Sequence, residues 1–167
     1  RNFKATVRLW ESPHFEILPG HGDLARFDSV RDFLRDQRLH GYYGAMRLIK
    51  ATVKRFHDWC RDQGIDLHDR NFTIGFESDI PRLVGLSGSS AIICATVRAL
   101  QQFYGVTIEK HLMPSLILSV ERDELGISAG LQDRVIQTYE GIVYMDFDRE
   151  LLTTRGYGEY IPLHPPK

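Results

Sequence analysis

The sequence has few cysteines, no excess of positive charge and no long uninterrupted hydrophobic run. Its 167 residues contain 21 Lys and Arg against 22 Asp and Glu, which gives a formal net charge of -1 at pH 7. A chain that binds nucleic acid or a membrane surface non-specifically carries a basic excess, so this balance argues against both partners. Charged residues such as Arg98 and Glu121 interrupt the apolar segments, which predicts no transmembrane span.

Cysteine is scarce enough to exclude two structural classes. Cys60 and Cys94 are the only cysteines, they are not spaced as a CxxC pair, and both lie in segments with helical periodicity. This excludes a disulfide scaffold and gives no zinc framework. We expect both thiols to be reduced and buried as small hydrophobic residues, in a reducing and therefore cytoplasmic compartment. The N-terminal segment, which begins with Arg1, does not resemble a signal peptide.

Hydrophobic periodicity predicts a mixture of strands and helices in one domain, hence an α+β or α/β fold. Alternating apolar residues predict strands at residues 3–9, 15–18, 72–76 and 142–147. The first two of these strands could pair as a hairpin across Glu11-Ser12-Pro13. Helical spacing, N-terminal signals and glycine stops predict a short helix that begins near Ser29. The same signals predict four further helices at about 42–62, 89–103, 114–125 and 131–139.

The segment 81–91, Pro-Arg-Leu-Val-Gly-Leu-Ser-Gly-Ser-Ser-Ala, is rich in glycine and serine. Gly85 and Gly88 allow a close approach of the backbone to a ligand, and the serines offer short hydroxyls. The segment leads into the apolar run 91–95, so a buried helix would present its free N–H groups and its dipole there. Such a helix start binds anions, phosphate above all. Because neither a Walker P-loop nor a dinucleotide fingerprint is present, a flexible loop with a serine N-cap remains the alternative.

Two acidic residues form the second candidate site. Glu121 lies on an otherwise apolar helical face, and Asp133 lies early in a helix that small residues introduce. Near a phosphate-binding loop, one carboxylate could hold Mg2+ while the other orients or deprotonates an attacking hydroxyl. The alternative is a pair of solvated acids, with Asp133 favoured by the helix dipole. Asp123 and Glu124 are expected to be solvated neighbours of this pair.

Both candidate sites resemble motifs of the GHMP kinases, the superfamily of galactokinase, homoserine kinase, mevalonate kinase and phosphomevalonate kinase. Residues 81–91 are similar to its second signature, with one additional residue in Gly85-Leu86-Ser87-Gly88-Ser89-Ser90-Ala91. Residues 129–133 resemble its Gly-x-x-Asp catalytic stretch, and Glu121 stands where its metal-binding glutamate belongs. The chain also resembles the plant-type glucuronokinases, which share the additional residue, and this similarity extends over most of its length. The segments that carry it include 41–44, 71–73, 124–127, 129–135 and 143–147.

The resemblance implies an α+β fold, that of a GHMP kinase N-terminal domain with the ribosomal protein S5 domain 2-like architecture, incomplete at both ends. Residues 1–150 would be the partial ATP-binding domain, and residues 151–167 a linker toward a C-terminal domain that is not present. The N-terminal signature and the Gly-rich third signature of the superfamily do not occur in the sequence. We therefore expect the chain to be the central piece of a longer kinase, inactive by itself and a weak binder of ATP.

The resemblance also implies an activity, the ATP-dependent phosphorylation of the anomeric (C1) hydroxyl of glucuronic acid to glucuronic acid 1-phosphate. Asp133 would act on the C1 hydroxyl, and Ser90 and Glu121 would hold Mg2+. Arg134 could bind the sugar carboxylate, because arginine pairs bidentately with carboxylates, although a surface ion pair is an equal alternative. The residues expected to hold the ATP phosphates are Gly85, Leu86, Ser87, Gly88, Ser89, Ser90 and Ala91.

The expected partners are glucuronic acid, ATP and the remainder of the same kinase chain. Two other functions stay open. The acceptor could be another sugar such as galactose, within the same superfamily. The chain could also belong to a catalytically silent GHMP-like subunit that binds a partner or scaffolds an assembly.

Overall fold

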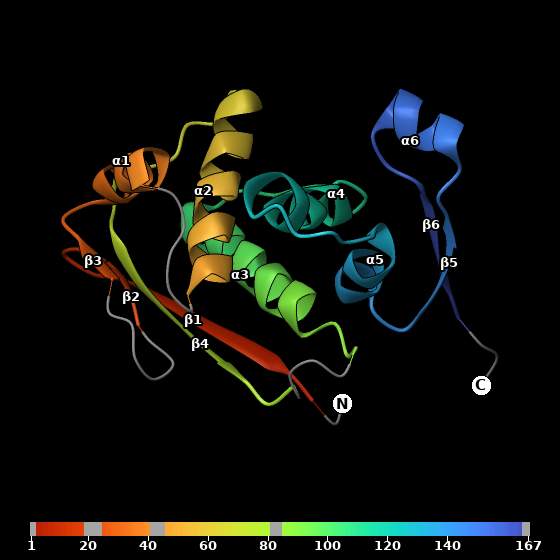
Figure 1. Cartoon of the computed structure of the whole chain (residues 1–167), viewed down its shortest axis with the longest axis horizontal. Helices are drawn as coiled ribbons and strands as arrows, with labels where there is room; N and C mark the ends of the chain where they lie inside the picture. The colour runs from red at the N-terminus through yellow and green to blue at the C-terminus, as the bar shows by residue number, and fades with distance from the viewer. Residues whose placement is uncertain (1–2, 19–24, 41–45, 81–84, 165–167) are drawn as a thin grey trace.

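The computed structural model describes residues 3–18, 25–40, 46–80 and 85–164, which contain both strands and helices (Figure 1). In chain order the elements are β1 (Ala5–Glu11), β2 (Phe15–Ile17), β3 (Ala25–Phe27), α1 (Val30–His40), α2 (Arg47–Asp62), β4 (Phe72–Ser78), α3 (Gly88–Tyr104), α4 (Met113–Ser119), the π-helix η1 (Val120–Glu124), α5 (Leu131–Tyr139), β5 (Ile142–Asp146), α6 (Arg149–Arg155) and β6 (Glu159–Leu163). The predicted mixture of strands and helices is confirmed.

The main sheet has four strands in the order β1-β4-β2-β3. The predicted hairpin between the first two strands is wrong, because β4 lies between them, antiparallel to β1 and parallel to β2. The physical reason is burial. Phe72, Thr73 and Ile74 of β4 are all buried, so this segment needs neighbours on both sides, whereas β1 is at most half-buried along its length.

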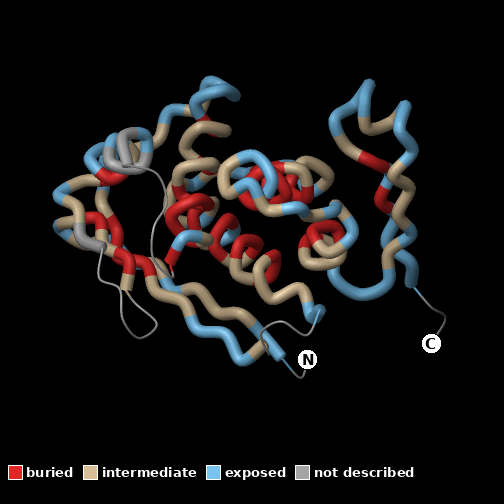
Figure 2. The backbone as a smooth tube through the Cα atoms, in the orientation of Figure 1, coloured by how far each residue is buried: buried red, intermediate tan, exposed pale blue. Residues whose placement is uncertain are grey.

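Helices cover one face of this sheet and close the core. α3 packs on β1 and β4, while α2, α4 and α5 pack on α3 (Figure 1). This position explains why α3 is apolar on nearly all sides, as expected of a buried helix. Figure 2 shows the buried segments gathered between the sheet and the helices. The largest fully buried side chains are those of Phe15, Phe33, Phe56, Phe72, Ile17, Ile49, Ile74, Ile93, Leu100, Ile117, Val53 and Val97.

A second, two-stranded sheet stands beside the helices. β5 and β6 pair antiparallel, and α6 forms the connection between them (Figure 1). Part of α6 and all of β6 fall in the segment 151–167, for which the sequence predicted only a linker. The role of this segment as a linker to a further domain stays a prediction. The strand β3, the helix α6 and the strand β6 were not predicted.

None of the helices in the described ranges has the length and apolar character needed to span a bilayer.

Candidate active site

The start of α3 presents free backbone N–H groups. Within the described residues 85–91, Ser87 occupies the N-cap position with a φ of 54°, and its side chain makes no cap hydrogen bond. The Ser87 carbonyl instead accepts hydrogen bonds from the Ala91 N–H at 3.0 Å and from the Ser90 hydroxyl at 2.9 Å. Because no acidic residue lies in the first turn either, this turn keeps the partial positive charge of a 17-residue helix. The geometry suits an anion, while residues 81–84 of the motif lie outside the described part of the chain.

The same loop combines an exposed tip with an anchored helix. Leu86 is 48% exposed, whereas Ser90 is fully buried and Ala91 nearly so. Gly88 lies against Ile80, whose Cγ2 would be 3.4 Å from an added Cβ. Gly85 has a φ of 74°, in the left-handed region that favours glycine. The sequence pattern therefore produces a rigid helix start under a short exposed turn, which is the arrangement that phosphate sites use.

Glu121 is positioned by a change of helix type. The helix predicted at 114–125 is divided into α4 and the π-helix η1, in which the Leu125 N–H donates to the Val120 carbonyl at 3.2 Å. The Ile127 N–H then donates to the Glu121 carbonyl at 2.8 Å. A π-turn adds a residue to the helical repeat and re-aims the side chains that follow, which is why such turns are frequent at functional sites. Here it leaves the Glu121 side chain buried.

Arg134 joins the buried glutamate to the start of α5. Its Nη2 donates to Oε2 of Glu121, and its Nη1 donates to the Gly130 carbonyl at 3.0 Å. Nη1 also lies 3.5 Å from Oδ2 of Asp133. The side chains of Arg134 and Glu121 are only 6% and 3% exposed, so the ion pair between them is shielded from solvent.

Asp133 differs from Glu121 in its environment. It lies in the first turn of α5, after the N-cap residue Gly130, and its side chain is 47% exposed. One carboxylate of the predicted pair is thus buried and the other open to a ligand, with one guanidinium between them. Among the described contacts, none joins Ser90 directly to these residues, although α3 and α5 pack together. The structure therefore brings together Glu121, Asp133 and Arg134, for which we predicted three separate roles from the sequence.

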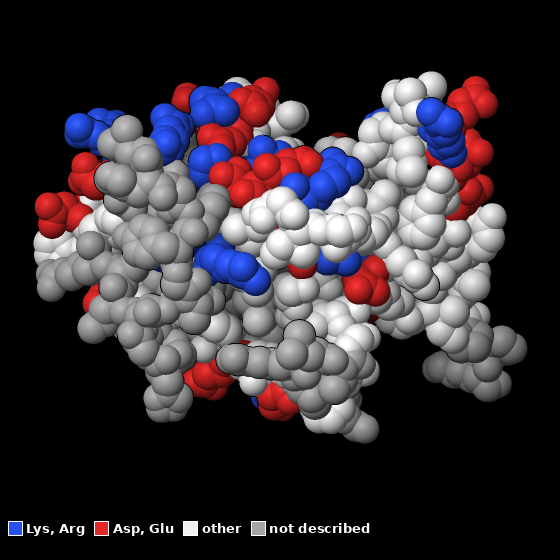
Figure 3. All heavy atoms as spheres, in the orientation of Figure 1, with Lys and Arg blue, Asp and Glu red and all other residues white. Residues whose placement is uncertain are grey.

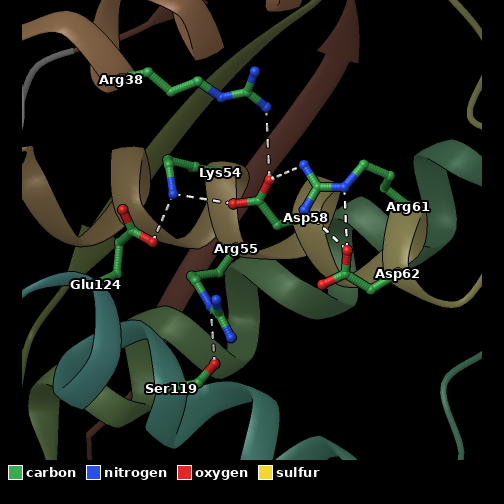
Figure 4. Close-up of polar contacts among 8 residues, drawn as sticks. All are labelled: Arg38, Lys54, Arg55, Asp58, Arg61, Asp62, Ser119 and Glu124. Atoms are coloured by element: carbon green, nitrogen blue, oxygen red, sulfur yellow. Dashed lines mark hydrogen bonds and ion pairs between the residues drawn. The ribbon is translucent and has the colours of Figure 1, made fainter.

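A network of charges holds the other side of η1, and sequence reasoning missed it (Figure 4). Lys54 Nζ lies 2.8 Å from Glu124 Oε2 and 3.0 Å from Asp58 Oδ2, while Arg61 and Arg38 lie 2.9 and 3.8 Å from Asp58 Oδ1. Burial by itself would raise the pKa of the Asp58 carboxyl. The hydrogen bond and charge of Lys54 and the charges of the two arginines outweigh it and hold this pKa below its usual value.

The expectation that Glu124 is solvated is therefore wrong, since its side chain is 13% exposed and paired with Lys54. Asp123 is exposed, and it pairs with Arg122. The spacing of Lys54 and Asp58 on one helix could have predicted their contact. No local signal could have predicted the contact with Glu124, which is 70 positions away. On the face shown in Figure 3, basic and acidic side chains are intermixed over α1, α2 and η1.

The family of the chain follows from the comparison with known proteins. Residues 46–141, more than half of the chain, match the family model described as GHMP kinases N terminal domain, so the chain belongs to the GHMP kinase family. It is 44% identical to Glucuronokinase 1 and 46% identical to Probable glucuronokinase 2, both from Arabidopsis thaliana. These matches cover 97% and 99% of this chain but 45% and 47% of the two relatives. The chain thus spans about half the length of the curated relatives it matches.

Solved structures of related kinases share the fold. A crystal structure of mevalonate kinase matches with a TM-score of 0.70 and 22% identity, over 85% of this chain and 44% of that one. Galactokinase from Lactococcus lactis, complexed with galactose, matches with a TM-score of 0.67 and 17% identity, over 98% of this chain and 40% of that one. The predicted resemblance to the GHMP kinases and the predicted α+β fold of their N-terminal domain are both confirmed.

Proposed function

We propose that the protein to which this chain belongs is an ATP-dependent sugar kinase that phosphorylates the C1 hydroxyl of glucuronic acid and yields glucuronic acid 1-phosphate. The observation that carries this proposal is the half-exposed carboxylate of Asp133 beside the buried Glu121–Arg134 pair, in a GHMP kinase domain. The glucuronic acid acceptor is supported by the 44% and 46% identity to the two Arabidopsis proteins named glucuronokinases.

The phosphates of ATP would lie at the start of α3, against residues 85–91. The first-turn N–H groups there are without a side-chain cap among the described residues, and the helix behind them is fixed in the core. Hydrogen bonds from such N–H groups to phosphate oxygens are charge-assisted and do not need a basic side chain. This binding mode is consistent with the near-zero net charge of the chain.

Ser90 and Glu121 fit a magnesium site in their chemistry, since both offer the hard oxygen ligands that Mg2+ prefers. The Ser90 hydroxyl, which is buried, donates to the Ser87 carbonyl, and its oxygen accepts no hydrogen bond from any described residue. Arg134 occupies Oε2 of Glu121, while Oε1 accepts no hydrogen bond from any described residue. When bound, Mg2+ would neutralise charge on the phosphoryl group that is transferred.

Asp133 would accept the proton of the sugar C1 hydroxyl. As the C1 oxygen forms its bond to the γ-phosphorus, the bond from that phosphorus to the β-γ bridging oxygen breaks, and ADP leaves with the bonding electrons. The exposure of the Asp133 side chain allows the contact with an acceptor that this step requires. The predicted contact of Arg134 with the sugar carboxylate stays a prediction, because its guanidinium is turned toward Glu121 and Gly130.

The test uses the full-length protein with the Asp133→Asn variant and coupled detection of ADP. Glucuronic acid, galacturonic acid, galactose and glucose serve as acceptors. We expect turnover with glucuronic acid, and a loss of about 100-fold or more in kcat for Asp133→Asn, the range typical of general bases. The control is Asp123→Asn, which changes an exposed acid outside the site and should leave turnover unchanged.

Three results would contradict parts of the proposal. Retained turnover in Asp133→Asn would remove the role of Asp133. Turnover with galactose but not with glucuronic acid would overturn the acceptor. ATP binding without turnover on any acceptor would favour the silent GHMP-like subunit instead.

A further inference from the structure

The side chain of Arg134 is buried, and polar contacts rather than apolar packing hold its guanidinium in place. A buried guanidinium is costly unless a counter-charge and hydrogen bonds compensate it. Glu121 supplies the counter-charge and accepts a hydrogen bond from Nη2, and the Gly130 carbonyl accepts one from Nη1. Nε is buried and has no hydrogen-bond partner among the described residues. The orientation of the guanidinium is therefore set by its two terminal nitrogens, which face the two carboxylates.

The geometry of the guanidinium relates those carboxylates to each other. Its two terminal nitrogens are fixed in one plane, so groups bound to them are held at a set spacing. One nitrogen holds the buried Glu121 of η1, and the other lies 3.5 Å from the half-exposed Asp133 of α5. The hydrogen bond to Gly130 ties the same nitrogen to the N-cap residue of α5. A lysine, with a single ammonium, could not hold both sides in this way.

We propose that Arg134 is a positioning residue that fixes the spacing and orientation of the Glu121 and Asp133 carboxylates. This inference rests on the proposed function, in which Asp133 takes the acceptor proton. A misplacement of about 1 Å in reacting groups can lower a rate by about 100-fold without weakening substrate binding. Arg134 therefore sets kcat, and it does not contribute to the KM for the sugar.

This role differs measurably from a contact with the sugar carboxylate. Loss of a substrate-binding arginine raises the KM for glucuronic acid and spares a sugar that has no carboxylate. Loss of a positioning arginine lowers kcat for every acceptor that the enzyme accepts, at nearly constant KM. The two roles can thus be separated by the kinetic parameter that changes.

The kinetic experiment uses the full-length enzyme with Arg134→Lys and Arg134→Met. Arg122→Met is the matched control, because Arg122 lies next to Glu121 on η1 but is exposed, and it pairs only with Asp123 among the described residues. We expect kcat to fall about 10-fold for the lysine variant, which keeps the charge, and about 100-fold for the methionine variant. KM for glucuronic acid should stay within about 2-fold of the parent value, and Arg122→Met should match the parent.

A second measurement does not depend on catalysis. Urea midpoints are compared for Glu121→Gln, Arg134→Met and the double variant, with a chelator present to remove divalent metal. We expect the double variant to lose less than the sum of the two single losses, because each single change leaves a buried group without its partner. If Arg134→Met does not fold, Arg134→Lys replaces it in this cycle.

The outcomes distinguish the inference from the function it rests on. A raised KM for glucuronic acid at unchanged kcat would overturn the positioning role in favour of the sugar contact. Kinetics equal to those of Arg122→Met, or strictly additive midpoint losses, would also overturn it. A parent enzyme with no turnover on any acceptor would instead overturn the proposed function.

Discussion

Acidification from pH 7 to pH 5 should destabilise the protein through His57 of α2. This side chain is largely enclosed, its Nε2 lies 3.1 Å from the Tyr104 hydroxyl, and the two rings meet edge to face with centroids 5.3 Å apart. Burial lowers the pKa of His57 from 6.5 to about 4, and the nearby charge of Asp58 only partly offsets this. The folded protein therefore keeps this histidine neutral at a pH where the unfolded chain protonates it.

The sign and the size of the effect follow from proton linkage. Below pH 6.5 the unfolded chain binds a proton that the folded protein excludes, so stability falls with pH until about pH 4. With these two pKa values the loss reaches about 2 kcal/mol at pH 5, and it levels off at about 3 kcal/mol below pH 4. Asp58 does not interfere with this measurement. Its pKa in the folded protein is below the ordinary value of 3.8, so the stability that it contributes is lost only as the pH falls below 3.8.

The measurement is urea unfolding of the 167-residue chain at several pH values between 7.5 and 5, followed by circular dichroism. His57→Gln keeps a hydrogen-bonding group near Tyr104 but cannot take up the proton, so its free energy of unfolding should change much less over this range. His14→Gln is the control, because the His14 side chain is 40% exposed. An equal loss of stability in parent and His57→Gln would refute the assignment of the effect to this side chain.

Two further predictions concern the framework of the site. Lys54→Met leaves the Glu124 and Asp58 carboxylates without their shared cation. It should lower the free energy of unfolding, measured by urea titration, by about 2 kcal/mol. A change below about 0.5 kcal/mol would show that solvent screens the network. Gly105→Ala places a Cβ at a φ of 68°, where the C-terminus of α3 needs a left-handed residue, and should cost about 1 kcal/mol by the same measurement. Gly130→Ala is its control, since that residue has a φ of -116° and open space around it, and equal losses in both would contradict the backbone argument.

Much of the local structure around the candidate site residues could be predicted because its signals are local. The glycines and serines of residues 85–91 and the apolar run after them predicted the buried start of α3. The positions of Glu121 and Asp133 were predicted from the residues around each of them. Helical spacing, caps and glycine stops act over a few residues, so a short window of sequence contains all that they need.

The tertiary structure decided the contacts between segments. Only the folded chain shows that η1 is a π-helix, that Arg134 turns inward to Glu121, and that Lys54 reaches Glu124. Arg134 is adjacent to an exposed aspartate in the sequence, and nothing local distinguishes it from a surface residue or a substrate ligand. Its direction depends on the buried carboxylate of Glu121, which η1 presents to it as the continuation of α4, the helix that packs on α5.

The same distinction holds for the fold. By itself the sequence indicated most of the strands and helices and which helix is buried, because periodicity and composition express local preference and burial; it missed β3, α6 and β6. It did not determine that β4 separates β1 from β2. That order depends on which strand gains most from neighbours on both sides. The comparison involves segments as far apart in the chain as Ala5 and Ser78, which pair in the sheet, and only the assembled core makes it.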